Sequence, residues 1–214
     1  MAQKTLSQIL YDANSVLDLE YDLPVGDELS TRANYADQAI WDASALGQFQ
    51  EFKQEYLVGL SNSATVPMPS NFREVMQNPQ MWDGSGWNEY NIIEAEEKYS
   101  QSPNERYCYV LGNADDGYNM IFNQPIDGST LSVLYQRLPN GLVTLTDRCE
   151  LSDPQYVVRK IESYVLYSRT DDRFTIAEQR AQTALSNMLG RSSKGSTPNR
   201  DTKSKFSNPL RNLS

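Results

Sequence analysis

The spacing of apolar residues changes twice along this 214-residue chain, and this change limits the folds it can adopt more than any other feature. Near both ends, apolar residues recur every three or four positions, which is typical of helices packed on one side. Between them, short runs alternate apolar and polar side chains, which is typical of strands with one buried face. The pattern predicts an α+β fold: a mainly α-helical bundle of about four helices, a β-rich insertion between helices 2 and 3, and an extended C-terminal tail.

The four helices are expected at about residues 5–19, 31–51, 154–169 and 172–189. The first begins with a capping-box pattern, Thr5 followed by Gln8, in which each side chain can satisfy the other residue's backbone N–H. The third begins at Asp153-Pro154, because aspartate caps helices and proline suits the first helical position. Gly190 is a typical C-terminal end for the fourth.

The middle of the chain, about residues 53–150, is the expected β-rich insertion. Apolar alternation indicates strands in runs that include Tyr56 to Leu60, Tyr107 to Leu111, Met120 to Phe122 and Leu131 to Tyr135. The stretch from Met81 to Tyr99 lacks this alternation, and we expect a long loop with one short acidic helix around Ile93–Lys98. Residues 1–189 are thus expected to form a folded body.

The charge is divided unevenly between this body and the tail, residues 190–214. The whole chain carries −9, and residues 187–214 contain six basic residues and one acid, or +5, which leaves −9 − 5 = −14 for residues 1–186. A net negative charge argues against a general nucleic-acid binder. An acidic body with a basic tail suggests that the two parts have different partners, although the acid can also serve only to keep the body soluble.

Catalytic and metal-binding patterns are missing from the sequence. It has no histidine, which is the commonest general base and metal ligand, and Cys108 and Cys149 lack metal-type spacing. We expect both cysteines to be buried free thiols in a protein made in a reducing cytosol without a signal peptide or membrane span. Paired carboxylates such as Asp115-Asp116 fit turns and helix starts better than catalysis. No catalytic residue, cofactor or metal is assigned.

Two groups of residues are candidates for binding other proteins. The tail combines cations with spaced apolar groups, a composition that suits a docking peptide, although an inert end or a phosphate-binding arm would also fit. Its candidate residues are Lys194, Arg200, Lys203, Lys205, Phe206, Leu210, Arg211 and Leu213. Trp82 and Trp87 lie in a glycine-containing stretch and are candidates for a subunit interface, with ordinary sheet packing as the alternative.

The layout resembles the head-to-tail adaptor (connector or neck) family of tailed phages over most of residues 3–189. Residues 5–17 and 31–52 resemble that family's first two helices, and Met68-Pro69-Ser70-Asn71-Phe72 resembles its "Leu-Pro-Ser-Asp-Phe" type of turn after a strand. Residues 106–139 resemble its β-insertion, and residues 153–189 resemble its closing helix pair with an acidic break. The stretch Met81–Trp87 has no counterpart in the family.

The resemblance implies a structural virion protein of the head-tail junction, made in the host cytoplasm. Such proteins form a ring, usually of twelve copies, on the portal protein after DNA packaging, and their C-terminal segments run along or between portal subunits. Tail or nozzle proteins attach below, and DNA passes through the lumen without specific binding. No reaction, cofactor or membrane is implied.

Three other functions remain open at this point. Another tail-completion or ring structural protein would share the acidic body and docking tail. A cellular non-enzymatic interaction module would instead be a stable monomer without a ring-shaped partner. An enzyme would need a pocket with convergent acids, which the sequence alone cannot reveal.

Overall fold

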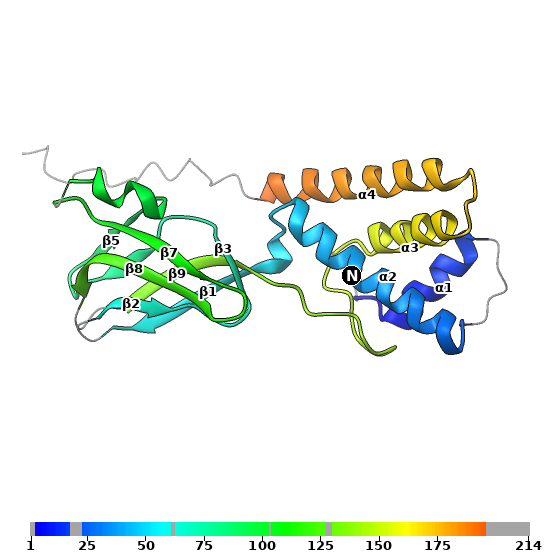
Figure 1. The fold of residues 1–214 in the computed structure, drawn as a ribbon, viewed down its shortest axis with the longest axis horizontal. Helices are drawn as coiled ribbons and strands as arrows, with labels where there is room; N and C mark the ends of the chain where they lie inside the picture. The colour runs from blue at the N-terminus through cyan, green and yellow to red at the C-terminus, as the bar shows by residue number, and fades with distance from the viewer. Residues whose placement is uncertain (1–2, 18–22, 61–62, 103, 127–129, 196–214) are drawn as a thin grey trace, which may run out of the picture.

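The computed structural model describes residues 3–17, 23–60, 63–102, 104–126 and 130–195, with the backbone alone at 125–126 and 191–195. The molecule is elongated, with helices at one end and β-sheets at the other (Figure 1). Within the described residues, two N-terminal and two C-terminal helices flank two β-sheets, so the predicted α+β class, with the sheets inserted between the second and third helices, is confirmed.

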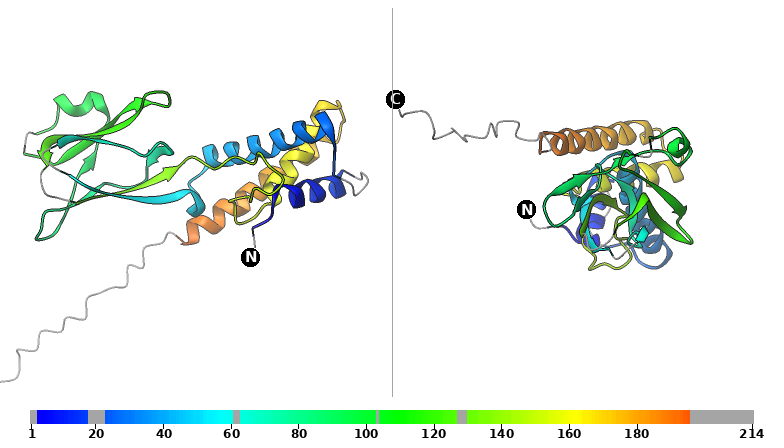
Figure 2. Two further views of the ribbon diagram at one scale, coloured as in Figure 1. Left: turned by 90° about the horizontal axis from the view of Figure 1, so that it is seen from below. Right: turned by 90° about the vertical axis from the view of Figure 1, so that its left-hand side faces the viewer.

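The described helices form one bundle (Figure 2). They are α1 (Leu6–Val16), α2 (Gly26–Leu46), α3 (Gln155–Ser168) and α4 (Phe174–Gly195). The predicted capping box is confirmed, because the Thr5 N–H donates to Gln8 Oε1 at 2.9 Å and the Gln8 N–H donates to Thr5 Oγ1 at 3.4 Å. Residues 18–19, the expected end of the first helix, lie outside the described residues.

Helices α2 and α4 have boundaries that differ from the sequence prediction. Helix α2 begins at Gly26 and ends at Leu46, instead of covering about 31–51. Asp27 and Glu28 occupy its first turn, where acidic side chains are favoured by the helix dipole. Ser30, just before the expected start at about residue 31, instead lies within the helix and donates to the Gly26 carbonyl at 3.4 Å. Helix α4 continues five residues beyond Gly190, the expected cap.

The insertion forms two sheets, which we call the β module. Its strands are β1 (Lys53–Gly59), β2 (Ser63–Pro67), β3 (Phe72–Val75), β4 (Gln80–Trp82), β5 (Trp87–Glu89), β6 (Asn91–Ile92), β7 (Tyr107–Asn113), β8 (Gly117–Ile126) and β9 (Thr130–Arg137). One sheet has the order β1-β9-β4-β5, with β3 also paired to β9, and the other has the order β2-β8-β7-β6.

The stretch from Met81 to Tyr99 is not the long loop that was expected. It completes the hairpin of β4 and β5 and forms β6, followed by a 3-10 helix, η2 (Ala95–Tyr99), close to the predicted acidic helix. The hairpin strands have only three residues each, too few for a clear alternation. Pairing of β4 with β9 over three residues supplies the stability that the local sequence does not.

The two ends of the molecule have separate apolar cores. The bundle core is built from one face of each helix and includes Ile9, Ile40 and Ile161, all fully buried. The β module encloses a second core between its sheets, which includes Met120, Leu131 and Val133. Because the two cores are separate, contacts at the junction between them contribute to how the two parts are held together.

Candidate interaction surfaces

An exposed pair of tryptophans marks one face of the β module. Trp82 on β4 lies directly opposite Trp87 on β5, and their ring centroids are 5.6 Å apart. Trp82 is 37% exposed and Trp87 is 52% exposed. Met81, which precedes Trp82 on β4 and is paired with Asn88, points the other way and is buried. The structure therefore brings together the two tryptophans that the sequence singled out, on the outer face of the sheet.

The turn that joins these strands is held by Asp83. One carboxylate oxygen accepts hydrogen bonds from the Ser85 and Gly86 backbone N–H groups at 2.9 and 3.0 Å, and the other accepts from Asn88 at 2.6 Å. These bonds, with the backbone bond from Ser85 the largest effect, hold the pKa of Asp83 well below its ordinary value. Gly84 supplies the positive φ that the turn requires. The tryptophans are thus presented on a well-ordered hairpin.

A further exposed apolar residue, Leu57, lies on the same side of the sheet as the tryptophans of this hairpin. Trp82 pairs with Thr130 on β9, which in turn pairs with Gly59 on β1. Leu57 lies two residues from Gly59 on the same side of β1 and is 58% exposed. We call Leu57, Trp82, Trp87 and Thr130 the tryptophan face. Rigid aromatic groups beside exposed aliphatic surface are typical of protein–protein contacts.

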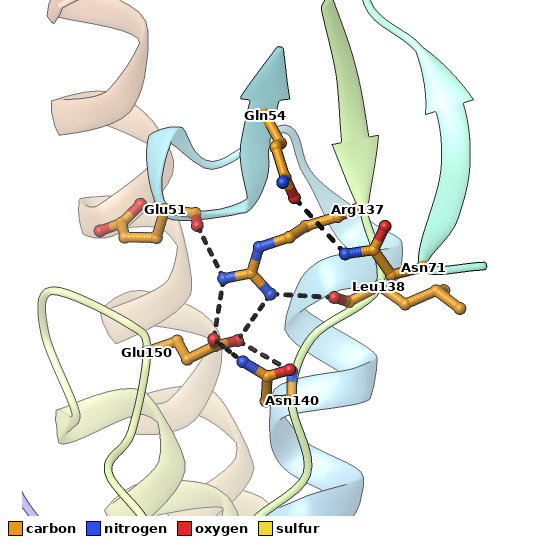
Figure 3. Close-up of polar contacts among 7 residues, drawn as sticks. All are labelled: Glu51, Gln54, Asn71, Arg137, Leu138, Asn140 and Glu150. Atoms are coloured by element: carbon orange, nitrogen blue, oxygen red, sulfur yellow. Dashed lines mark hydrogen bonds and ion pairs between the residues drawn. The ribbon is translucent and has the colours of Figure 1, made fainter. Parts of the chain in front are cut away.

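The junction between the bundle and the β module is organised around Arg137 (Figure 3). Its guanidinium donates to both carboxylate oxygens of Glu150, at 2.8 and 3.2 Å, and to the carbonyls of Glu51 and Leu138 at 3.3 and 3.0 Å. Glu51 directly precedes the module, whereas Leu138 and Glu150 follow it. One arginine therefore ties together the two chain crossings between the parts of the molecule.

A second set of contacts at the junction involves the C-terminal end of α2. The Gln136 side-chain amide donates to the carbonyls of Ser44 and Gly47, at 3.0 and 3.2 Å, and Gln136 is only 1% exposed. Arg73 on β3 donates to the Ser44 hydroxyl at 2.8 Å. Since the last carbonyls of a helix lack partners within it, the β module caps α2. We call these contacts and those of Arg137 the polar junction.

The sequence alone does not predict the polar junction. Gln136 and Ser44 are 92 residues apart, and Arg137 and Glu150 are 13 residues apart without a shared helix or strand. The only available signal was a pair of polar residues, Gln136 and Arg137, at the end of an otherwise apolar alternation.

The structure does not show where the candidate binding residues of the C-terminal tail lie. Arg200, Lys203, Lys205, Phe206, Leu210, Arg211 and Leu213 lie outside the described residues. The backbone of Lys194 belongs to α4, and its side chain is not described.

The cysteines and the Asp115-Asp116 pair occupy structural positions in the β module and beside the bundle. The expectation of buried free thiols is confirmed for Cys108 and Cys149, and burial raises their pKa values to about 12 and about 11. The backbone N–H groups of Asp115 and Asp116 bond to Asn113 in the β7–β8 turn. Within the described residues, no cluster of three or more metal-binding side chains is present. None of the helices there is long and apolar enough to cross a bilayer.

Comparison with known proteins adds no assignment. No protein-family model matches the chain, and a search of curated proteins found no significant match. The surfaces described above are therefore the basis for a functional proposal.

Proposed function

We propose that this chain is a non-enzymatic structural protein of a tailed-phage virion, a head-to-tail adaptor that binds the portal as a ring and carries the tail. The observation that supports this most is the architecture itself. A helical bundle carries a β module at one end, inserted between α2 and α3, as the resemblance to the adaptor family implies. The proposal extends to the partners: portal, tail or nozzle proteins, and further copies of the chain.

The polar junction favours a connector whose two parts keep a fixed orientation. Arg137 and Glu150 are largely buried, with side chains 17% and 13% exposed, and their two parallel hydrogen bonds restrict their relative orientation. Gln136 adds two bonds to the end of α2. A protein that holds a phage tail in place on a portal needs a fixed orientation between its own two parts.

The two candidate surfaces have different chemistry. The tryptophan face presents two exposed aromatic rings on the module, whereas the C-terminal tail is basic. We propose that the C-terminal tail of this chain contacts the portal. The tryptophan face would make a second protein contact within the assembly. Repetition of a weak tail contact around a ring would give high avidity.

The test is co-sedimentation with purified portal rings, using the full chain, a chain ending at Gly195, and the double variant Trp82→Ser/Trp87→Ser. Tyr99→Ser is the control, because Tyr99 is an exposed aromatic residue of the β module outside the tryptophan face. Ring binding by the full chain and both substitution variants, with loss on truncation, supports the proposal. Isolated tail tubes or nozzle proteins are then added to the bound rings, and loss of their co-sedimentation in the tryptophan variant alone would support the second contact.

Failure of the full chain to bind portal rings would overturn the portal assignment. Binding to isolated tail tubes in that case would indicate a tail-completion protein. Binding to neither, by a stable monomer, would favour a cellular interaction module.

A further inference from the structure

An open groove lies between the two sheets of the β module, on the side of β3 and β7. It has a volume of about 410 Å³ and is lined by apolar side chains from both sheets, among them Val75, Ile92, Val110 and Leu111. Leu111 is 43% exposed, whereas the other three are partly buried and pack against the module core. The groove therefore presents apolar surface that the described residues leave uncovered.

The backbone along this groove also has free pairing capacity. Strand β6 pairs with β7 only at Tyr107 and Cys108, and among the described residues no strand continues on that side of β7. The Ile93 N–H donates to the Cys108 carbonyl at 3.0 Å. Backbone N–H and C=O groups alternate in direction along a strand, so those of Val110 point to the same side of β7 as the Cys108 carbonyl. An extended segment could add to β7 there as a further strand.

The rim of the groove is acidic. Glu74, Glu94 and Glu96 line it and are exposed, against one cation, Arg73, which is engaged with Ser44. Three acids and one base give the lining a formal charge of −3 + 1 = −2. A groove with apolar walls and an acidic rim matches an extended segment that carries both apolar and basic side chains.

The chain itself contains such a segment. Residues 203–214 hold Lys203, Lys205 and Arg211 with no acid, together with Phe206, Leu210 and Leu213. In an extended conformation Phe206 and Leu210 share one face, because they are four residues apart, while Lys205 points to the other side. One face can therefore meet the apolar wall while lysines lie near the rim.

The place where the described chain ends makes this contact accessible within one molecule. Helix α4 runs toward the β module (Figure 1), and Leu189 packs against Gly47, just before the chain enters that module. The eleven residues from Gly195 to Phe206 can span at most about 36–40 Å. The longest strand, β8, has 10 residues, or about 33 Å, so the reach is comparable to the module's length.

We propose that the segment Lys203–Leu213 of this chain binds its own groove, adding an extended strand to the edge of β7 with Phe206 on the side of Val110 and its neighbours in the segment on the side of Leu111. A short tether gives the segment a high effective concentration at the groove, which favours binding within one molecule over binding between molecules. The inference concerns the free protein and does not depend on which assembly the protein joins.

The test is amide hydrogen exchange followed by mass spectrometry on the full chain in dilute solution. We expect exchange in residues 203–213, apart from Pro209 which has no amide hydrogen, and at Val110 to slow by about tenfold or more relative to three variants: Leu111→Asp, Glu74→Lys/Glu96→Lys, and Phe206→Ser. The controls are Glu105→Lys, an exposed acid of the β module that does not line the groove, and Ser207→Asn in the tail. Glu105→Lys should retain the protection, and so should Ser207→Asn, because Ser207 lies on the side of the extended segment opposite Phe206.

Equal exchange in the full chain and all variants would overturn the proposal. Protection that appears only as the protein concentration rises would overturn binding within one molecule and identify a second copy as the occupant. Tryptic cleavage after Lys203 and Lys205 gives a separate readout, since the bound segment should be cut more slowly in the full chain than in Leu111→Asp. Far-ultraviolet circular dichroism of each variant distinguishes loss of binding from loss of folding.

Discussion

The side-chain amide of Gln136 donates a hydrogen bond to the carbonyl of Ser44 at 3.0 Å, joining the last residue but one of β9 to the end of α2. The same amide also reaches the Gly47 carbonyl at 3.2 Å. These bonds satisfy carbonyls that no residue within α2 can reach, and they do so at a buried position. The relationship links the two separate cores of the molecule.

Replacing Gln136 by Leu should destabilise the protein by about 1–3 kcal/mol, because it leaves buried carbonyls without donors. Urea unfolding followed by circular dichroism measures this difference. Gln77→Leu is the control, since Gln77 is an exposed glutamine of the β module. An equal effect of the two substitutions would contradict the capping role of Gln136.

The ion pair of Arg137 and Glu150 should behave as a coupled unit. Arg137→Met or Glu150→Gln alone should cost about 3–5 kcal/mol, because each leaves a charge largely buried without its partner. The double variant should cost less than the sum of the two. Urea unfolding of all four proteins gives the coupling energy, and additive costs would show that the pair does not stabilise the junction.

The parts of this fold that follow from local pattern could be predicted from sequence. Alternation at Leu131, Val133 and Tyr135 correctly indicated β9, and the capping box at Thr5 correctly indicated the start of α1. Trp82 and Trp87 were identified as candidate interface residues. Their pairing across two strands was not predicted, because the hairpin depends on pairing with β9 for stability. Long-range polar contacts such as Arg137 with Glu150 leave no local pattern to recognise.

The start of α2 shows a second reason why the sequence alone does not predict every element correctly. Ser30 and Thr31 are typical helix-capping residues, and they made a start near 31 look favourable. In the structure the Thr31 hydroxyl instead donates back to the Asp27 carbonyl at 2.8 Å, within the helix. The same side chain can cap a helix or bond to its preceding turn, and only tertiary packing decides between them.

Gly112 is required by the close approach of β7 to β8. A Cβ at this position would lie 2.1 Å from the Gly117 carbonyl oxygen, and the residue has φ of 130°. Gly112→Ala should therefore destabilise the protein by about 1–3 kcal/mol. The matched control is Gly59→Ala on β1, where a Cβ meets nothing within 4 Å. Thermal unfolding should give a clearly lower melting temperature for Gly112→Ala alone.

Acidification should weaken the contact between α3 and α4 through Glu178. Burial opposes ionisation of this carboxylate, but hydrogen bonds from Ser163, Gln182 and Lys160 hold its pKa below the ordinary value of 4.5. Because the folded-state pKa is lowered, the contribution to stability is present above about pH 4.5 and is lost as pH falls through the folded-state pKa.

Replacing Glu178 by Gln tests this contribution directly. The variant should be less stable than the unsubstituted chain by about 1 kcal/mol at neutral pH, since the carboxylate bonds Lys160 at 2.9 Å and Ser163 at 2.7 Å. The difference should shrink towards about pH 3, where the carboxylate is increasingly protonated. Urea unfolding at both pH values measures it, with exposed Glu105→Gln as the control. A difference that is the same at both pH values would mean that the charge of Glu178 does not stabilise the helix pair.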